Sequence, residues 1–233
     1  MTEEKDFALP KQSLGEEIVN SITHGIGAAL ATVALTILLV FAALKGDAWR
    51  VVSFAIYGTS LVIMYTSSTL YHAFTNKKAK RYFRIMDHSS IFLLIAGTYT
   101  PITLLELRDT GWGWTIFGLI WGMAILGILF KFLFYGKLEK LSVVFYVLMG
   151  WLAIVAIKPM LANLPTGLLI WIAIGGLSYT LGIIFYAWNK LPYSHSIWHL
   201  FVLGGSISHF FGIRRLSHVN MTAPTLNTGT DCA

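Results

Sequence analysis

The stretch Tyr193-Ser194-His195-Ser196-Ile197-Trp198-His199 opens the last hydrophobic segment of this 233-residue chain. It places two imidazoles four residues apart, and residues i and i+4 of a helix lie on one face with their Cβ atoms roughly 5–6 Å apart. Two neutral imidazoles on one face form half of a site for a transition metal, above all zinc. Standing alone, the same pair is also explained as two unrelated polar residues near a membrane interface. The positions of the other polar residues have to decide between these interpretations.

The composition predicts an integral membrane protein. Hydrophobic residues make up 56% of the chain and charged residues 12%, whereas a soluble domain carries roughly 25% charge. Residues 1–17 contain five acidic residues, so we do not expect a signal peptide. Cys232 is the single cysteine, which excludes an internal disulfide and thiolate ligation of a metal within the membrane. We attribute the net charge of +6 to loop topology and expect no nucleic-acid partner.

The hydrophobic segments predict the fold class. A spanning helix needs about 20 mostly apolar residues, and seven segments meet this requirement. We therefore expect an all-α membrane protein, a bundle of seven transmembrane helices whose short connections make sequence neighbours antiparallel. The predicted spans are 20–43, 51–74, 85–106, 112–134, 141–159, 166–188 and 196–213. We also expect a cytoplasmic N-terminal segment at 1–17, a transmembrane domain at 18–215 and a polar, disordered tail at 216–233.

The distribution of Lys and Arg predicts the orientation. With the N-terminus inside, eleven of the 17 Lys and Arg residues fall on the inner side of the membrane and six on the outer side. The positive-inside rule therefore predicts a cytoplasmic N-terminus and a C-terminus outside. Within the spans, Gly118 with Gly122 and the pair Gly204-Gly205 predict close packing between helices.

Ionisable residues inside membrane spans are costly, which makes them candidates for function. Given the predicted topology, Ser68 and His72 lie near the inner end of the second segment, and Asp87 lies near the inner start of the third. His195 and His199 lie at the inner start of the seventh segment. Three segments thus place their unusual polar groups at one depth, on the cytoplasmic side.

These residues fit a catalytic zinc site. Three imidazoles, from His72, His195 and His199, bind zinc and leave a fourth position for water, which is the arrangement of catalytic rather than structural sites. Asp87 suits a general base that holds this water, or a group that orients a ligand and offsets the charge of the metal. Ser68, one turn before His72, suits donation of a hydrogen bond to an oxyanion or to the water.

The pattern Ser68-x-x-x-His72, then Asp87, then His195-x-x-x-His199 in a seven-span protein resembles the hemolysin III family. That family belongs with the adiponectin and progestin receptors and, more remotely, with the alkaline ceramidases. The run Glu16-Glu17-Ile18-Val19-Asn20-Ser21-Ile22-Thr23-His24-Gly25 is similar to its bacterial branch, and the resemblance covers residues 16–215.

The resemblance implies a multi-pass protein of the bacterial inner, or plasma, membrane with a cytoplasm-facing zinc site. It implies that His72, His195 and His199 bind the metal, with Asp87 and Ser68 beside them and the aspartate in contact with the zinc-bound water. The long N-terminal region of the receptors has no counterpart here, so we expect no hormone-receptor role.

Four other ionisable residues are expected to lie outside this site. His88 points roughly 100° away from Asp87 on a helix of 3.6 residues per turn. His24 lies at a similar depth on the first segment, where we expect a structural role or contact with lipid. His209 lies about 15 Å deeper than the site at 1.5 Å per residue, and Glu106 lies at the outer end of the third segment.

The leading functional interpretation is a zinc-dependent hydrolase of a lipid amide or ester, whose substrate reaches the site from the inner leaflet. One alternative is a sensor or regulator of membrane lipid state in which zinc is structural. Another is a hemolysin-type pore or cytolysin, which we rank lower because a pore needs polar residues through the full membrane thickness. Taken singly, His72 is also explained as an interfacial histidine and Asp87 as a partner of Arg84. The sequence leaves open the substrate, the oligomeric state and whether turnover occurs.

Overall fold

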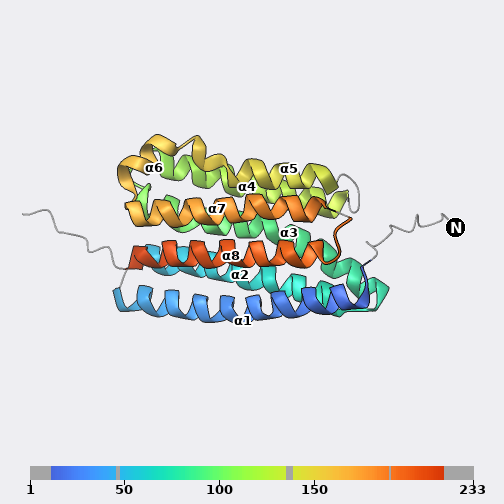
Figure 1. Ribbon diagram of the computed structural model, residues 1–233. Helices are drawn as coiled ribbons and strands as arrows, with labels where there is room; N and C mark the ends of the chain where they lie inside the picture. Colours follow the sequence, from blue (N-terminus) through green and yellow to red (C-terminus); the bar gives the residue numbers. More distant parts are fainter. Residues whose placement is uncertain (1–11, 46–47, 135–138, 189, 218–233) are drawn as a thin grey trace, which may run out of the picture.

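The computed structural model describes residues 12–45, 48–134, 139–188 and 190–217, which form a bundle of long helices (Figure 1). In chain order, the elements are α1 (Leu14–Lys45), α2 (Ala48–Ala73), α3 (Lys77–Pro101), the π-helical turn η1 (Ile102–Glu106), α4 (Trp112–Leu133), α5 (Glu139–Gly150), the 3-10 turn η2 (Leu152–Ile154), α6 (Ile157–Asn163), α7 (Thr166–Ala187), α8 (Ser194–Arg214) and the 3-10 turn η3 (Arg215–Ser217). Most of the predicted disordered tail, from residue 218 onward, lies outside the described residues.

The number of membrane spans agrees with the sequence. In the described part of the chain, six helices are each long and apolar enough to cross a membrane. The bent pair Leu141–Ile154 and Ile157–Asn163 supplies a seventh span when it is counted as one. The predicted fold class, an all-α bundle of membrane-spanning helices, is confirmed. The side of the membrane on which each terminus lies stays a prediction.

Two helices begin earlier than the hydrophobic pattern predicts. α1 begins at Leu14 instead of residue 20, within the segment expected to precede the bundle, and α3 begins at Lys77 instead of residue 85. The side chain of Asn76 caps α3 by accepting hydrogen bonds from the backbone N–H groups of Lys78 and Ala79. The first turns of α1 and α3 are therefore helical, although their polar and basic residues give no hydrophobic signal.

The helices are arranged so that the candidate residues meet. α1 packs on α2, α2 on α3, α3 on α4 and α7 on α8, while α1 also packs against α8. α5 packs against α3 and α4, and α6 packs against α7. α1, α3 and α8 begin at the same end of the bundle, on the right in Figure 1, and α2 ends there. This common end carries His72, Asp87 and His195, which confirms the predicted coincidence in depth.

The fifth predicted span is broken instead of continuous. α5 ends at Gly150 and is continued by η2, and the part that ends at Ile154 is inclined by 51° to Ile157–Asn163. The hydroxyl of Tyr99 in α3 donates to the carbonyl of Gly150 at 2.9 Å and accepts from the N–H of Ala153 at 2.8 Å. Backbone groups inside a membrane protein need partners within the protein. Tyr99 therefore satisfies the backbone where α5 passes into η2, just before the bend.

The glycine predictions have different outcomes. A Cβ atom added at Gly205 would lie 2.7 Å from the ring of Tyr179, so the predicted close approach of α7 and α8 is confirmed. No described atom outside the helix itself lies within 4 Å of a Cβ added at Gly118 or Gly122. The prediction that this pair packs against another helix is therefore wrong within the single chain, because this face of α4 is turned outward.

Replacing Tyr99 by Phe should lower the unfolding temperature, because the carbonyl of Gly150 and the N–H of Ala153 lose their shared partner. Leaving buried polar groups unsatisfied costs about 1–3 kcal/mol. Tyr82→Phe is the matched control, since Tyr82 is 56% exposed. Thermal unfolding in detergent measures both variants, and equal unfolding temperatures would contradict the role of Tyr99.

Candidate metal centre

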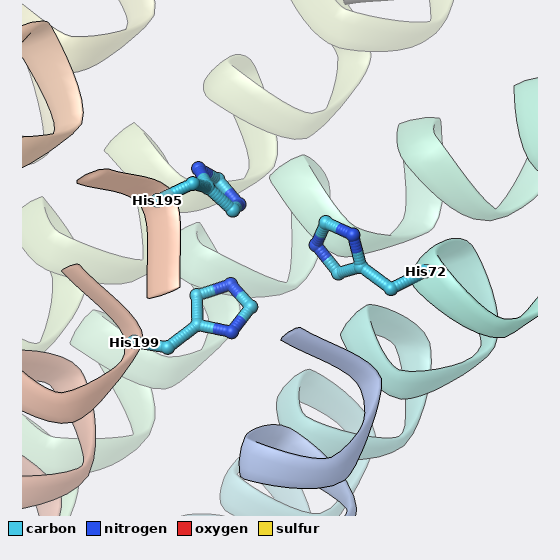
Figure 2. A group of neighbouring side chains, drawn as sticks. All are labelled: His72, His195 and His199. Atoms are coloured by element: carbon cyan, nitrogen blue, oxygen red, sulfur yellow. The ribbon is translucent and has the colours of Figure 1, made fainter. Parts of the chain in front are cut away.

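Three histidines from two helices meet at the end of the bundle where α1 begins. His72 comes from the last turn of α2, and His195 and His199 come from the first two turns of α8. The ring centroids are 5.2 Å apart for His72–His195 and for His72–His199, and 4.6 Å apart for His195–His199. Figure 2 shows the three rings around one common space, and one nitrogen from each lies within 4.8 Å of the others.

The chemistry of this cluster fits a metal ion. Nε2 of His72, Nε2 of His195 and Nδ1 of His199 are buried without a hydrogen-bond partner in the described part of the chain. Buried polar atoms are costly unless they are paired, and one divalent cation would satisfy all three nitrogens at once. Imidazole nitrogen suits zinc and several other transition metals. The cluster could therefore hold a metal ion, and its geometry alone does not select which one.

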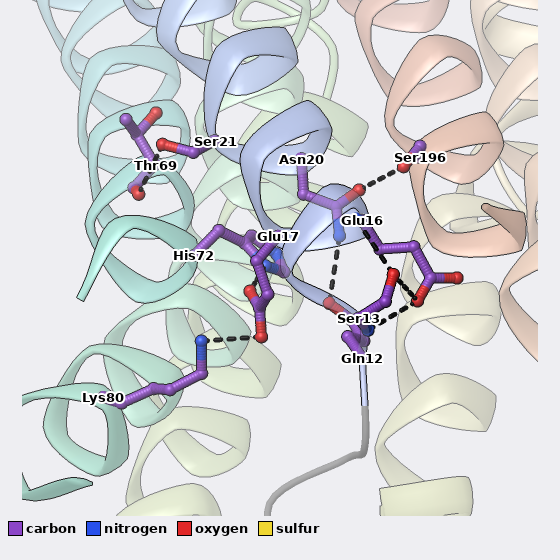
Figure 3. A network of polar contacts seen from close by, with 10 residues as sticks. All are labelled: Gln12, Ser13, Glu16, Glu17, Asn20, Ser21, Thr69, His72, Lys80 and Ser196. Carbon is purple, nitrogen blue, oxygen red and sulfur yellow. Dashed lines mark hydrogen bonds and ion pairs between the residues drawn. The ribbon is translucent and has the colours of Figure 1, made fainter. Parts of the chain in front are cut away.

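The first turn of α1 fixes the orientation of His72. Nδ1 of His72 and Oε2 of Glu17 form a hydrogen bond of 2.7 Å, and Oε1 of Glu17 pairs with Nζ of Lys80 at 2.7 Å (Figure 3). The side chain of His72 is fully buried. Because the carboxylate engages Nδ1, Nε2 is the nitrogen that remains as a ligand atom. A carboxylate on the second nitrogen also makes a histidine a stronger ligand.

The same turn of α1 holds the start of α8 (Figure 3). Oε1 of Glu16 accepts a hydrogen bond from the N–H of Tyr193 at 3.0 Å, and Oδ1 of Asn20 accepts from the hydroxyl of Ser196 at 2.6 Å. Tyr193 has a left-handed backbone with φ of 57°, which is uncommon for a bulky residue. The contacts with α1 stabilise this turn, and the turn directs His195 toward the cluster.

His24 of α1 lies against the cluster, a contact that the sequence alone does not predict. Its ring stacks on that of His199 at a centroid distance of 3.4 Å with planes 9° apart, and it meets the ring of Tyr65 edge-on at 5.0 Å. Its 3% exposure agrees with the structural role expected for His24 and excludes the alternative of contact with lipid. A ligand nitrogen points its lone pair within its own ring plane, and the two planes are parallel and separate. In this arrangement, His24 supports His199 by packing and does not add a fourth ligand.

A cavity of about 510 Å³ opens beside the cluster. Ser68, Asp87, His195 and His199 lie in its wall, and the rest of the wall is mainly apolar and extends to His209. Ser68 is fully buried, and its hydroxyl has no partner among the described residues. The structure thus places both candidate catalytic residues on the cavity side of the histidines, while His209 lies away from them, as predicted.

A second group of ionisable residues is centred on Glu139 and reaches the same cavity through Glu139 and His88. Oε2 of Glu139, the first residue of α5, accepts a hydrogen bond from Nζ of Lys131 at 2.7 Å and lies 3.2 Å from Nδ1 of His88, while its Oε1 lies 3.8 Å from Arg84. Burial raises the pKa of Glu139, but its hydrogen bonds and electrostatic interactions with His88 and Lys131 outweigh burial and hold this pKa well below its usual range. The charged carboxylate ties α5 to α3 and α4.

Comparison with known proteins decides the family. The family model described as "Haemolysin-III related" matches residues 12–210 of the chain. The chain belongs to this family. Hemolysin-3 of Bacillus cereus is 50% identical over 200 residues, which cover 86% of this chain and 91% of the relative. The Hemolysin-3 homolog of Bacillus subtilis (strain 168) is 48% identical over 199 residues, which cover 85% and 93%. The human monocyte to macrophage differentiation factor is 31% identical over 214 residues, which cover 87% and 85%.

Family membership and the apolar helices together make this haemolysin III-related chain a multi-pass bacterial membrane protein. The three histidines were predicted from the sequence, whereas the contact of Glu17 with His72 and that of His24 with His199 were not. A signal for both was present, because they lie in the run 16–25 that carries part of the resemblance. Their roles depend on which face of α1 turns toward α2 and α8, and this became visible only in the structure.

Replacing Glu17 by Gln should weaken zinc binding by roughly 10- to 100-fold, because the amide keeps the size of the side chain but loses the charge that orients a ligand. Glu106→Gln, at the opposite end of the bundle, is the control and should bind zinc like the wild type. Competition with a chelator on purified protein measures both dissociation constants. An unchanged constant for Glu17→Gln would contradict the role assigned to this carboxylate.

Proposed function

We propose that the chain is a zinc-dependent hydrolase of a lipid amide or ester. The observation that carries this proposal is the position of the three histidines, which lie at one end of a mainly apolar cavity of about 510 Å³. Ser68 and Asp87 line the same cavity beside His195 and His199. A polar reaction centre at the end of an apolar cavity suits a molecule with one polar group and a long hydrocarbon chain.

The length of the cavity supports a lipid substrate. Along α8, its wall extends from His195 to His209, a distance of about 21 Å at 1.5 Å per residue. This is roughly two-thirds of the hydrocarbon thickness of a bilayer, which is about 30 Å. The hydrocarbon chain therefore has room to lie along the bundle while the amide or ester reaches the histidines. With the N-terminus in the cytoplasm, this end of the cavity belongs to the inner leaflet.

Each residue of the candidate site has its own role in the proposed hydrolysis. His72, His195 and His199 would hold zinc, which supplies a Lewis acid that polarises a carbonyl group and lowers the pKa of water. Asp87 accepts the proton of the attacking water and delivers it to the leaving group. The Ser68 hydroxyl donates a hydrogen bond to the oxygen of the substrate carbonyl, where negative charge develops.

The pore alternative gains little support from the cavity. Polar side chains do extend beyond the cytoplasmic end, contrary to the expectation that they gather there alone. Thr98, Thr100 and Ser208 are all buried, but each donates its hydroxyl hydrogen bond to a carbonyl of its own helix. Hydroxyls satisfied in this way do not need water, whereas a conducting pore requires a continuous polar lining.

Replacing Asp87 by Asn should lower the rate of lipid hydrolysis by about 10²- to 10⁴-fold, because the amide cannot accept the proton. Bound zinc should remain at the wild-type level, since the three histidines are intact. Asp109→Asn is the control, because the carboxylate of Asp109 is 93% exposed. The readout is release of fatty acid from ceramides and other lipid amides and esters, measured by mass spectrometry.

Two outcomes would contradict this function. In the first, wild-type protein with one bound zinc per chain releases no product from the lipid panel, while removal of the metal lowers its unfolding temperature. That result would favour the sensor with structural zinc. In the second, Asp87→Asn hydrolyses lipid as fast as Asp109→Asn, which would remove Asp87 from the reaction.

A further inference from the structure

A groove on the far side of His72 gives the candidate metal centre a second face. The groove has a volume of about 400 Å³ and lies between the start of α1 and the turn that joins α2 to α3. Glu17, His72 and Lys80 are in its wall. His72 is absent from the described wall of the large cavity, whereas His195 and His199 line that cavity and not the groove. The groove and the cavity thus meet the histidine cluster at different residues.

The two spaces suit different molecules. The large cavity is mainly apolar, and a divalent cation that leaves water for apolar surroundings loses far more solvation energy than it can recover there. The groove also has apolar walls, to which Leu14, Ile18 and Phe74 contribute. It differs from the cavity in having the charged side chains of Glu17 and Lys80 together, beside the exposed turn at Thr75. The carboxylate of Glu17 attracts a cation, and its position next to His72 brings that cation to the edge of the centre.

The ion pair in the groove is arranged so that one partner can be exchanged. Each carboxylate oxygen of Glu17 has a different partner, because Oε2 contacts His72 and Oε1 contacts Lys80 (Figure 3). The side chain of Lys80 is 12% exposed and that of Glu17 14% exposed. Lysine carries its charge on a flexible stem of four carbons. A metal cation can thus take the place of the ammonium group without moving Glu17 away from His72.

We propose that this groove is the port through which the metal ion reaches the buried histidines, with Glu17 as its first ligand. The ammonium group of Lys80 occupies Glu17 until the metal ion displaces it. The proposal rests on the metal centre of the proposed function. It assigns opposite faces of the centre to the metal and to the lipid. A lipid in the cavity therefore does not block the loading of the metal.

The kinetics of zinc loading test the port. Metal-free protein in lipid nanodiscs is mixed with zinc buffered by a fluorescent chelator, and the association rate constant is measured by stopped flow. Lys80→Met should raise this constant roughly fivefold, because no ion pair has to separate. Lys80→Arg keeps the pair and should load like the wild type. Lys78→Met controls for the loss of one positive charge, since Lys78 is exposed in the same region and has no contact with Glu17 among the described interactions.

A second variant should act in the opposite direction. Thr75→Trp places a large ring at the rim of the groove without altering a candidate ligand, and it should slow zinc association. Chelator competition gives the dissociation constant of each variant, which should change less than its association rate. This separation of rate from affinity distinguishes a port from a change in the centre itself.

Three results would overturn the proposal. Wild-type loading rates for both Lys80→Met and Thr75→Trp would show that zinc reaches the centre from the cavity. Equal acceleration by Lys78→Met and Lys80→Met would show a general effect of charge. A wild-type protein that binds no zinc would remove the metal centre and the port together, whereas the first two results leave the centre and its proposed function intact.

Discussion

The hydrogen bond between Glu17 and His72 is the interaction on which the candidate centre depends. It connects the first turn of α1 to the last turn of α2, and the second oxygen of Glu17 connects the same turn to Lys80 of α3. Glu16 and Asn20, on either side, bond to the start of α8. In a low-dielectric interior, a buried imidazole takes the orientation in which its nitrogens find partners. One turn of α1 therefore determines how ligands from two other helices face each other.

The need of buried polar groups for hydrogen-bond partners also shapes the cavity. The break after α5 places backbone groups in the bundle without helical partners, and the hydroxyl of Tyr99 satisfies two of them. Beside the break, the indole of Trp151 donates to the hydroxyl of Thr180 in α7 at 3.2 Å. At the other end of α5, Glu139 binds side chains from α3 and α4. Polar contacts of this kind hold the broken helix at the wall of an apolar cavity while leaving the space inside it open.

The sequence predicts those features of the fold and of the candidate site that depend on a single segment. Hydrophobic length identifies the spans, and the depth of each polar residue within its span brings His72, His195 and His199 together. The break in the fifth span has a local signal in Pro159, which has no N–H for the carbonyl of Val155 and disfavours a continuous helix there. The partner of the neighbouring backbone, Tyr99, comes from another helix and has no such signal. The roles of Glu17 and His24 likewise depend on how α1 is rotated against α2 and α8. Periodicity within α1 does not determine that rotation.

Elemental analysis of detergent-purified protein shows whether the three histidines form one zinc site. We expect about one zinc per chain in the wild type. We also expect loss of that zinc both in His72→Ala and in the double variant His195→Ala, His199→Ala. A folded wild type without zinc after supplementation, or variants that retain zinc, would show that these histidines do not form such a site.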